Sequence, residues 1–207
     1  MYIPAHFRES DQIKLFGLIE QNSFGLLISQ LNDELFASHL PLLVDRQSGP
    51  HGTLIGHMAR ANPHWQMEDP NVLVVFSGPH AYISPSWYKA ENVVPTWNYV
   101  AIHVYGTFQA VEDHPETVQI VRNYVTFYEK AMPSPWTVQE GDEFIEKLTR
   151  SVVGFRVEIS RIEGKWKLNQ NHSRERQEKV AEQLSLRRDE NSQAIANLMA
   201  HNLMNEH

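Results

Sequence analysis

Groups able to bind an anion are concentrated in the segment Gly56–Trp65, which reads Gly-His-Met-Ala-Arg-Ala-Asn-Pro-His-Trp. The segment follows a strand-like run and precedes a predicted helical turn, where free backbone N–H groups can bind a phosphate. Arg60 adds a forked guanidinium donor, and His57 and Asn62 add further donors. Because the segment lacks a P-loop pattern, it also fits an ordinary strand-to-helix connection in which Arg60 pairs with a carboxylate.

A second segment, Pro95–Tyr99, combines two aromatic rings with an amide. The rings of Trp97 and Tyr99 can stack on a flat ligand, and the amide of Asn98 can donate to and accept from the edge of a heterocycle. The alternative interpretation is that the rings belong to the rim of a sheet and that Asn98 lies in a turn.

A third segment, Trp166–Asn171, places a cation among amides at the end of a predicted strand. In a binding site, Lys167 would face an anion, and amides such as that of Gln170 would contact the polar edge of a ligand. The segment fits equally well as the start of the following helix, with Asn171 or Ser173 as the N-cap residue.

Composition excludes several classes of chemistry. The chain has 207 residues and no cysteine, which rules out disulfides, thiol catalysis and Cys-ligated metals. The formal net charge of −7 argues against a surface built to bind nucleic acid. The 11 histidines show no HExxH spacing, so no metal site is expected. No signal peptide or membrane-length apolar run is visible, so we expect a cytoplasmic protein without a membrane partner.

The elements that must position the three segments are mostly strands. The long run 97–111 alternates strictly, with Val100, Ile102, Val104 and Phe108 on one face, and Gly106 indicates a bulge or a close backbone approach. Periodicity and turn residues predict strands at 24–29, 34–44, 53–58, 71–77, 81–83, 97–111 and 153–162, and helices at about 10–21, from 113 to before Pro133, at 142–150 and from 173 onward.

Successive strands joined by short turns favour a barrel over a βαβ alternation. The predicted fold class is therefore mainly β with flanking helices (α+β). We expect one domain over residues 1–172 and a C-terminal helical tail over residues 173–207, which packs on the barrel or on a partner. The tail has balanced charges, and its apolar positions include Val180, Leu184, Ile195 and Met199.

Taken in order, five segments of the chain resemble a known family. They are Met1–Phe7, Ser38–Leu42, Gly56–Trp65, Pro95–Gly106 and Lys167–Asn171. The resemblance is to the PaiB family, whose members are described as FMN-binding negative transcriptional regulators. It covers residues 1 to about 175.

This resemblance implies a split β-barrel that binds FMN, like that of pyridoxamine-phosphate oxidase, and a homodimer with FMN at the subunit interface. DNA binding is implied by the family description alone. The alternatives are a flavin reductase or oxidase, a haem-handling relative, or an interaction protein with an empty pocket. Arg60 is expected to hold the phosphate, and the cofactor-binding residues implied are Ser38, His39, Leu40, His57, Met58, Ala59, Arg60, Asn62, Trp97, Asn98, Tyr99, Lys167 and Gln170.

Overall fold

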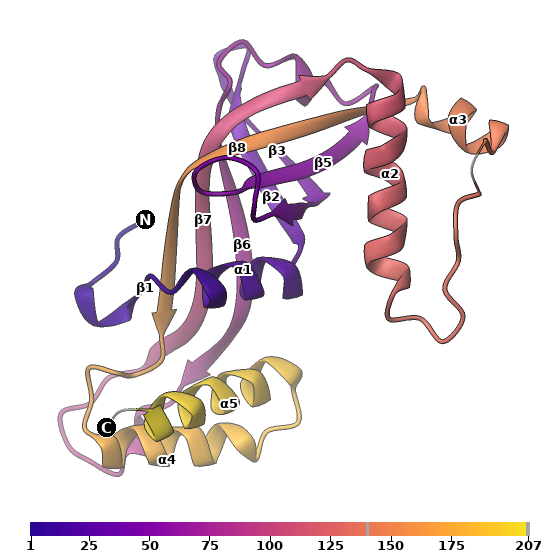
Figure 1. Cartoon of the computed structure of the whole chain (residues 1–207). Coiled ribbons are helices and arrows are strands. Elements are labelled where there is room, and N and C mark those ends of the chain that lie inside the picture. The colour runs from indigo at the N-terminus through magenta and orange to yellow at the C-terminus, as the bar shows by residue number, and fades with distance from the viewer. Residues whose placement is uncertain (140, 206–207) are drawn as a thin grey trace. The chain divides into compact units, whose positions relative to one another are not determined.

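The structure, a computed structural model, describes residues 1–139 and 141–205 (Figure 1). Its strands are β1 (Arg8–Glu9), β2 (Phe24–Leu31), β3 (Glu34–Pro41), β4 (Leu43–Asp45), β5 (Thr53–Ala59), β6 (Asn71–Ile83), β7 (Thr96–Val111) and β8 (Val152–Lys167). Its helices are α1 (Gln12–Gln21), α2 (His114–Glu129), α3 (Glu143–Thr149), α4 (Arg174–Ser185) and α5 (Glu190–Asn205), with short 3₁₀ turns η1 (Ala5–Phe7), η2 (Pro63–Gln66) and η3 (Pro85–Tyr88).

The strands follow one another in the sheet as β3-β2-β6-β7-β8-β5-β4, and β1 pairs with β8. The chain divides into two compact units. The first unit comprises residues 1–15, 77–102 and 163–207, and the second comprises residues 16–76 and 103–162. Strands β6, β7 and β8 contribute residues to both units. The division into residues 1–172 and 173–207 stays a prediction.

In the second unit, the sheet curls back on itself. Strands β2 and β3 pair antiparallel around Asn32 and Asp33, whose φ angles of 52° and 63° suit a two-residue hairpin turn. Strand β3 begins the strand order, yet it also contacts β5 near the other end. The sheet thus bends back on itself without closing, as the predicted split barrel requires.

Strand β7 confirms the predicted alternation, since Val100, Ile102, Val104 and Phe108 are all buried. Gly106 marks a close backbone approach within the second unit. A Cβ atom at this position would lie 2.3 Å from the carbonyl oxygen of Glu158 in β8. Only glycine therefore lets the two strands come this near.

Some predicted boundaries were wrong. The predicted strand 34–44 is interrupted after Pro41, and Leu42 donates its backbone N–H to Ser23 at 2.8 Å. The strands predicted at 71–77 and 81–83 are one continuous strand, β6. The strand predicted at 153–162 continues to Lys167 as β8, because Gly164 pairs with β1; a Cβ at Gly164 would lie 2.3 Å from Leu15. Gly164 thus serves close packing and does not form a turn.

The first unit contains the C-terminal helices. Helices α4 and α5 lie against each other, and α4 also contacts η3 (Figure 1). The apolar positions predicted for the tail are buried: Val180, Leu184, Ile195 and Met199. Among the described residues, no helix is both long enough and apolar enough to cross a membrane.

Candidate functional site

The structure distributes the thirteen predicted site residues between the two units. The β5 group lies in the second unit and consists of Ser38, His39, Leu40, His57, Met58, Ala59, Arg60 and Asn62. The β7–β8 group lies in the first unit and consists of Trp97, Asn98, Tyr99, Lys167 and Gln170. Each group has its own geometry, which decides which of its polar atoms can meet a ligand.

Arg60 follows the last residue of β5 and is exposed. Its Nε donates to the carbonyl of Arg150 and its Nη2 to the carbonyl of Val152, each at 3.0 Å. The carboxylate pairing considered from the sequence is absent among the described residues. Since a guanidinium has five N–H donors, these bonds hold the side chain in place and leave three donors without an acceptor in the described chain. Arg60 is thus oriented and able to bind an anion.

Ser38 and Asn62 face inward instead, because a buried histidine binds them. His64 is 0% exposed, and its Nδ1 and Nε2 each lie 2.9 Å from a serine hydroxyl, of Ser38 and Ser29 respectively. Asn62 donates from Nδ2 to Ser38 at 3.0 Å and accepts from the backbone N–H of His64 at 3.0 Å. Burial lowers the pKa of His64, which favours the neutral ring. This network holds η2 against β2 and β3.

The sequence analysis assigned no role to His64. The available signal was the run Asn62-Pro63-His64, in which an asparagine can cap a turn that begins with proline. The two serine partners lie on other strands, and one sequence does not reveal such a pairing.

His57 presents a buried atom without a partner. Its ring packs edge-on to Tyr124 of α2 at a centroid distance of 4.7 Å, and its Nδ1 is buried with no hydrogen-bond partner in the described chain. Burial lowers the pKa of His57. The Tyr124 hydroxyl lies 2.6 Å from the Pro41 carbonyl and 2.7 Å from that of Ile55, so it bridges the ends of two strands. Burial raises the pKa of Tyr124.

The remaining β5-group side chains differ in exposure. Leu40 and Met58 are buried and belong to the core, whereas His39 and Ala59 are exposed. The His39 ring stacks near Phe24 of β2, with 6.1 Å between centroids. The exposed members of the β5 group are therefore His39, Ala59 and Arg60.

In the first unit, Lys167 points along the start of β7. Its Nζ donates to the carbonyl of Trp97 at 2.6 Å and to the hydroxyl of Thr96. Burial, and next the neighbouring positive charge of Lys165, lower the pKa of Lys167. The Trp97 indole is 52% exposed and lies edge-on to Tyr82, with 5.8 Å between centroids. These two rings offer an aromatic surface.

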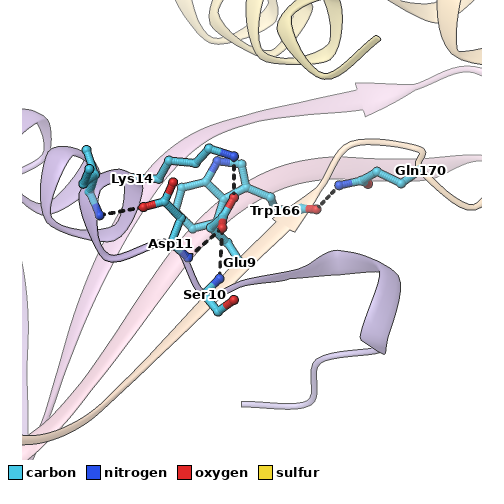
Figure 2. Close-up of polar contacts among 7 residues, drawn as sticks. Glu9, Ser10, Asp11, Lys14, Trp166 and Gln170 are labelled. Carbon is cyan, nitrogen blue, oxygen red and sulfur yellow. Dashed lines mark hydrogen bonds and ion pairs between the residues drawn. The ribbon is translucent and has the colours of Figure 1, made fainter. Parts of the chain in front are cut away.

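The two amides of this group are engaged within the protein. Asn98 is fully buried and donates to the sulfur of Met199 in α5 at 3.4 Å, while its Oδ1 has no partner among the described residues. Gln170 donates to the carbonyl of Trp166 at 2.7 Å, as Figure 2 shows, and accepts from the N–H of Leu168 at 2.7 Å. Gln170 thereby closes the turn after β8.

Tyr99 contributes a ring to a buried lysine. The Lys165 ammonium is 5.1 Å from the ring centroid of Tyr99 and 5.7 Å from that of Tyr2, and it donates to the Tyr2 carbonyl at 3.1 Å. Such cation–π contacts stabilise a charge that has little access to water. Tyr99 therefore has a structural partner within its own unit.

Comparisons with known proteins give a consistent result. The sequence model of a family described as "Putative FMN-binding domain" matches residues 1–161. A relative from Bacillus subtilis (strain 168), "Protease synthase and sporulation protein PAI 2", is 35% identical over 203 residues, which cover 96% of each chain.

Two solved structures share the fold. The flavocytochrome Anf3 from Azotobacter vinelandii aligns with a TM-score of 0.60 and 12% identity, over 80% of this chain and 72% of its own. The FAD and Heme binding protein from Mycobacterium smegmatis aligns with a TM-score of 0.55 and 11% identity, over 77% of this chain and 73% of its own. The predicted fold class, a mainly β split barrel with flanking helices, is confirmed.

Proposed function

Because this chain belongs to the FMN-binding domain family that it matches over residues 1–161, we propose that it acts as a homodimeric FMN-binding regulator of the PaiB type. FMN is its cofactor. The regulatory role comes from the resemblance to PaiB proteins, which are described as negative transcriptional regulators. The localisation that suits this role is the cytoplasm.

The residues present fit the chemistry of FMN. The cofactor has a dianionic phosphate and a flat ring with a polar edge, and the observation that carries the proposal is the oriented guanidinium of Arg60 with three unused N–H donors. His39 and Ala59 flank the same strand ends and are exposed. When bound, FMN supplies the redox chemistry of its ring, and the protein supplies binding and orientation.

Of the other predicted residues, some have a group available to a ligand and others are already hydrogen-bonded within the protein. The His57 Nδ1 has no partner in the described chain, so a hydrogen bond from a ligand would satisfy it. Trp97 offers an exposed indole for stacking. Ser38 and Asn62 support the strand ends through His64, and we assign them a positioning role.

A second copy of the chain is the proposed partner. The β2–β3 hairpin exposes apolar side chains that a subunit interface would cover, with Phe24 at 66% and Leu35 at 84% exposure. Light scattering coupled to size exclusion would measure the mass. We expect twice the 23.9 kDa of the chain, and a monomer at micromolar concentration would contradict the dimer.

The decisive experiment is titration of the purified protein with FMN and, in parallel, with riboflavin. We expect a yellow protein that retains FMN through desalting and binds riboflavin at least tenfold more weakly, because riboflavin lacks the phosphate. Equal affinity for the two flavins would remove the phosphate contact, and a colourless protein after desalting would contradict FMN binding altogether.

Two assays on the FMN-loaded protein then show whether it acts as a regulator or as an oxidoreductase. A regulator shifts promoter DNA in a salt-dependent manner, because phosphate contacts release counterions. A flavin-dependent oxidoreductase instead oxidises NADH or NADPH at a rate proportional to its bound FMN. DNA binding without turnover supports our proposal, and turnover without DNA binding supports the alternative.

A further inference from the structure

The first unit contains a pocket of about 290 Å³ beside Lys167. Its walls come from the start of β7, the turn after β8 and the first turns of α4. Lining residues that matter for its chemistry are Phe7, Tyr88, Lys167, Asn169, His172 and Arg176. The sequence analysis named Lys167 and the amides that follow it, but it assigned no role to Tyr88, His172 or Arg176.

Positive charge in this pocket is not balanced from within. Lys167, His172 and Arg176 line it, and none of the described residues that line it is acidic. Glu175 interacts electrostatically with Arg176, but its ion pair is with Lys179, at 2.7 Å, and it does not line the pocket. Basic groups gathered without a counter-charge are unfavourable unless something else supplies the negative charge.

Arg176 is the clearest sign of a missing ligand. Its side chain is half-buried, and it makes no hydrogen bond or ion pair with any residue of the described chain. Arg174, two positions earlier, binds Glu178 through its Nε at 2.9 Å, as expected for an i,i+4 pair on a solvated helix face. An arginine that gives up part of its hydration without a partner is costly, and a bound anion removes that cost.

The pocket also has rigid walls. The Lys167 ammonium is held by Thr96 and Trp97, which leaves one of its three N–H donors free. Asn169 donates to the hydroxyl of the buried Tyr88 at 3.0 Å, and the His172 ring lies 5.1 Å from that of Tyr88. Binding would therefore require little reordering of these side chains.

We propose that this pocket binds a phosphate monoester through Lys167 and Arg176, with His172 as a third donor and with the rings of Phe7 and Tyr88 against the organic part. The ammonium of Lys167 and the guanidinium of Arg176 match the charge of a phosphate dianion, and the volume suits a ligand of single-ring size. The phosphate could belong to FMN itself or to a separate phosphorylated metabolite.

Inorganic phosphate is the probe, measured by calorimetry at constant ionic strength on protein loaded with FMN and on protein freed of it. We expect Arg176→Ala to weaken phosphate binding at least tenfold. Arg174→Ala removes the same charge from the same helix but lies outside the pocket lining, so it should keep the wild-type affinity. Equal affinity in wild type, Arg174→Ala and Arg176→Ala would overturn the proposal.

Two further variants guard against a folding defect. Arg176→Gln keeps a polar chain of similar reach, and Lys167→Met keeps the length of the lysine side chain. Each should weaken phosphate binding while the circular dichroism spectrum and thermal midpoint stay near those of wild type. If both variants keep their structure and bind phosphate as wild type does, the proposal is wrong.

Comparing FMN-loaded with FMN-free protein shows whether the pocket binds the phosphate of FMN or that of a separate metabolite. If a separate metabolite uses the pocket, phosphate binds FMN-loaded and FMN-free protein equally, and Arg176→Ala leaves FMN affinity unchanged. If FMN's own phosphate uses it, FMN blocks the probe and Arg176→Ala weakens FMN but not riboflavin. Either result supports the pocket, and the second one reassigns the phosphate contact from Arg60. If the wild-type protein does not bind FMN, the proposed function is refuted, but phosphate titration of the FMN-free protein still tests the pocket.

Discussion

The β5 group and the pocket of the first unit contain similar residue types but use them differently. In the β5 group, the amide of Asn62 and the ring of His64 bind other protein groups. In the pocket, Arg176 has no partner among the described residues. The comparison teaches that residue type alone does not separate a structural cluster from a ligand site. What separates them is whether the donors already have acceptors.

The largest effect is expected at the buried histidine of the β5 group. His64→Ala removes the partner of two buried hydroxyls and leaves a cavity, so we expect a loss of about 3 kcal/mol in unfolding free energy. Urea unfolding measures it. His39→Ala, on the same sheet but exposed, should change stability by less than about 0.5 kcal/mol. Similar losses in both variants would show that the network is not structural.

Arg60 is the member of the β5 group that should behave as a ligand contact. We expect Arg60→Ala to weaken FMN binding by about 1.5–3 kcal/mol, because a charge-assisted bond to the phosphate is lost. Fluorescence titration measures the dissociation constant. Arg46→Ala is the control, since Arg46 binds Glu20 through two N–H groups at the surface. If Arg60→Ala leaves the dissociation constant for FMN unchanged, the β5 group has a structural role only.

Tyr124 tests the structural role of the β5 region by the removal of a single hydroxyl group. Tyr124→Phe leaves the buried carbonyls of Pro41 and Ile55 without the hydroxyl, and we expect a loss of about 1.5 kcal/mol in unfolding free energy. Tyr82→Phe, at an exposed site in the first unit, should have no measurable effect on stability. Equal stability of wild type and Tyr124→Phe would mean that water replaces the hydroxyl.

The pH dependence of stability follows from the buried histidines. Burial lowers the pKa of His57 and His64 below the ordinary value of 6.5, so the unfolded chain binds protons more readily. Unfolding free energy should therefore fall as the pH decreases through 6.5 towards the folded-state pKa. Unfolding curves at several pH values would measure the slope. His64→Gln should flatten the slope, and an unchanged slope would assign it to other groups.

The smallest effect is expected for the stability of the pocket variant. Arg176 makes no bond in the described chain, so Arg176→Ala should alter unfolding free energy by less than about 0.5 kcal/mol while it weakens phosphate binding. Thermal and urea unfolding measure this. A large destabilisation would show that Arg176 has a structural role, as His64 has, and would contradict its assignment to a ligand site.

Local patterns predicted much of the fold. The alternation in β7 and the apolar positions in α4 and α5 depend on neighbours in the chain, so one sequence suffices to read them. The strand expected over 153–162 was ended too early, because a glycine needed for close packing, here Gly164, looks the same in sequence as one needed for a turn. Packing partners decide between these uses, and they lie far away in the chain.

The candidate site was less predictable for the same reason. Arg60 could be found from its place after a strand, whereas Arg176 sits in a helix whose charges look evenly balanced. Asn98 shows the opposite case, in which the sequence suggested a ligand contact and the structure shows a contact within the protein. Its amide suggested contact with a ligand, but Met199, about a hundred positions later, covers it in the structure. Its role in FMN binding stays a prediction.

The caged ammonium of Lys165 has a consequence for chemical labelling. It is only 7% exposed, with the rings of Tyr2 and Tyr99 and a carbonyl around it, so an acylating reagent has little room to approach. Lys167 lies two residues away, borders an open pocket and has a lowered pKa, which raises the share of its nucleophilic amine form. Two lysines on one strand thus differ in their access to an acylating reagent, and we expect Lys167 to react faster than Lys165.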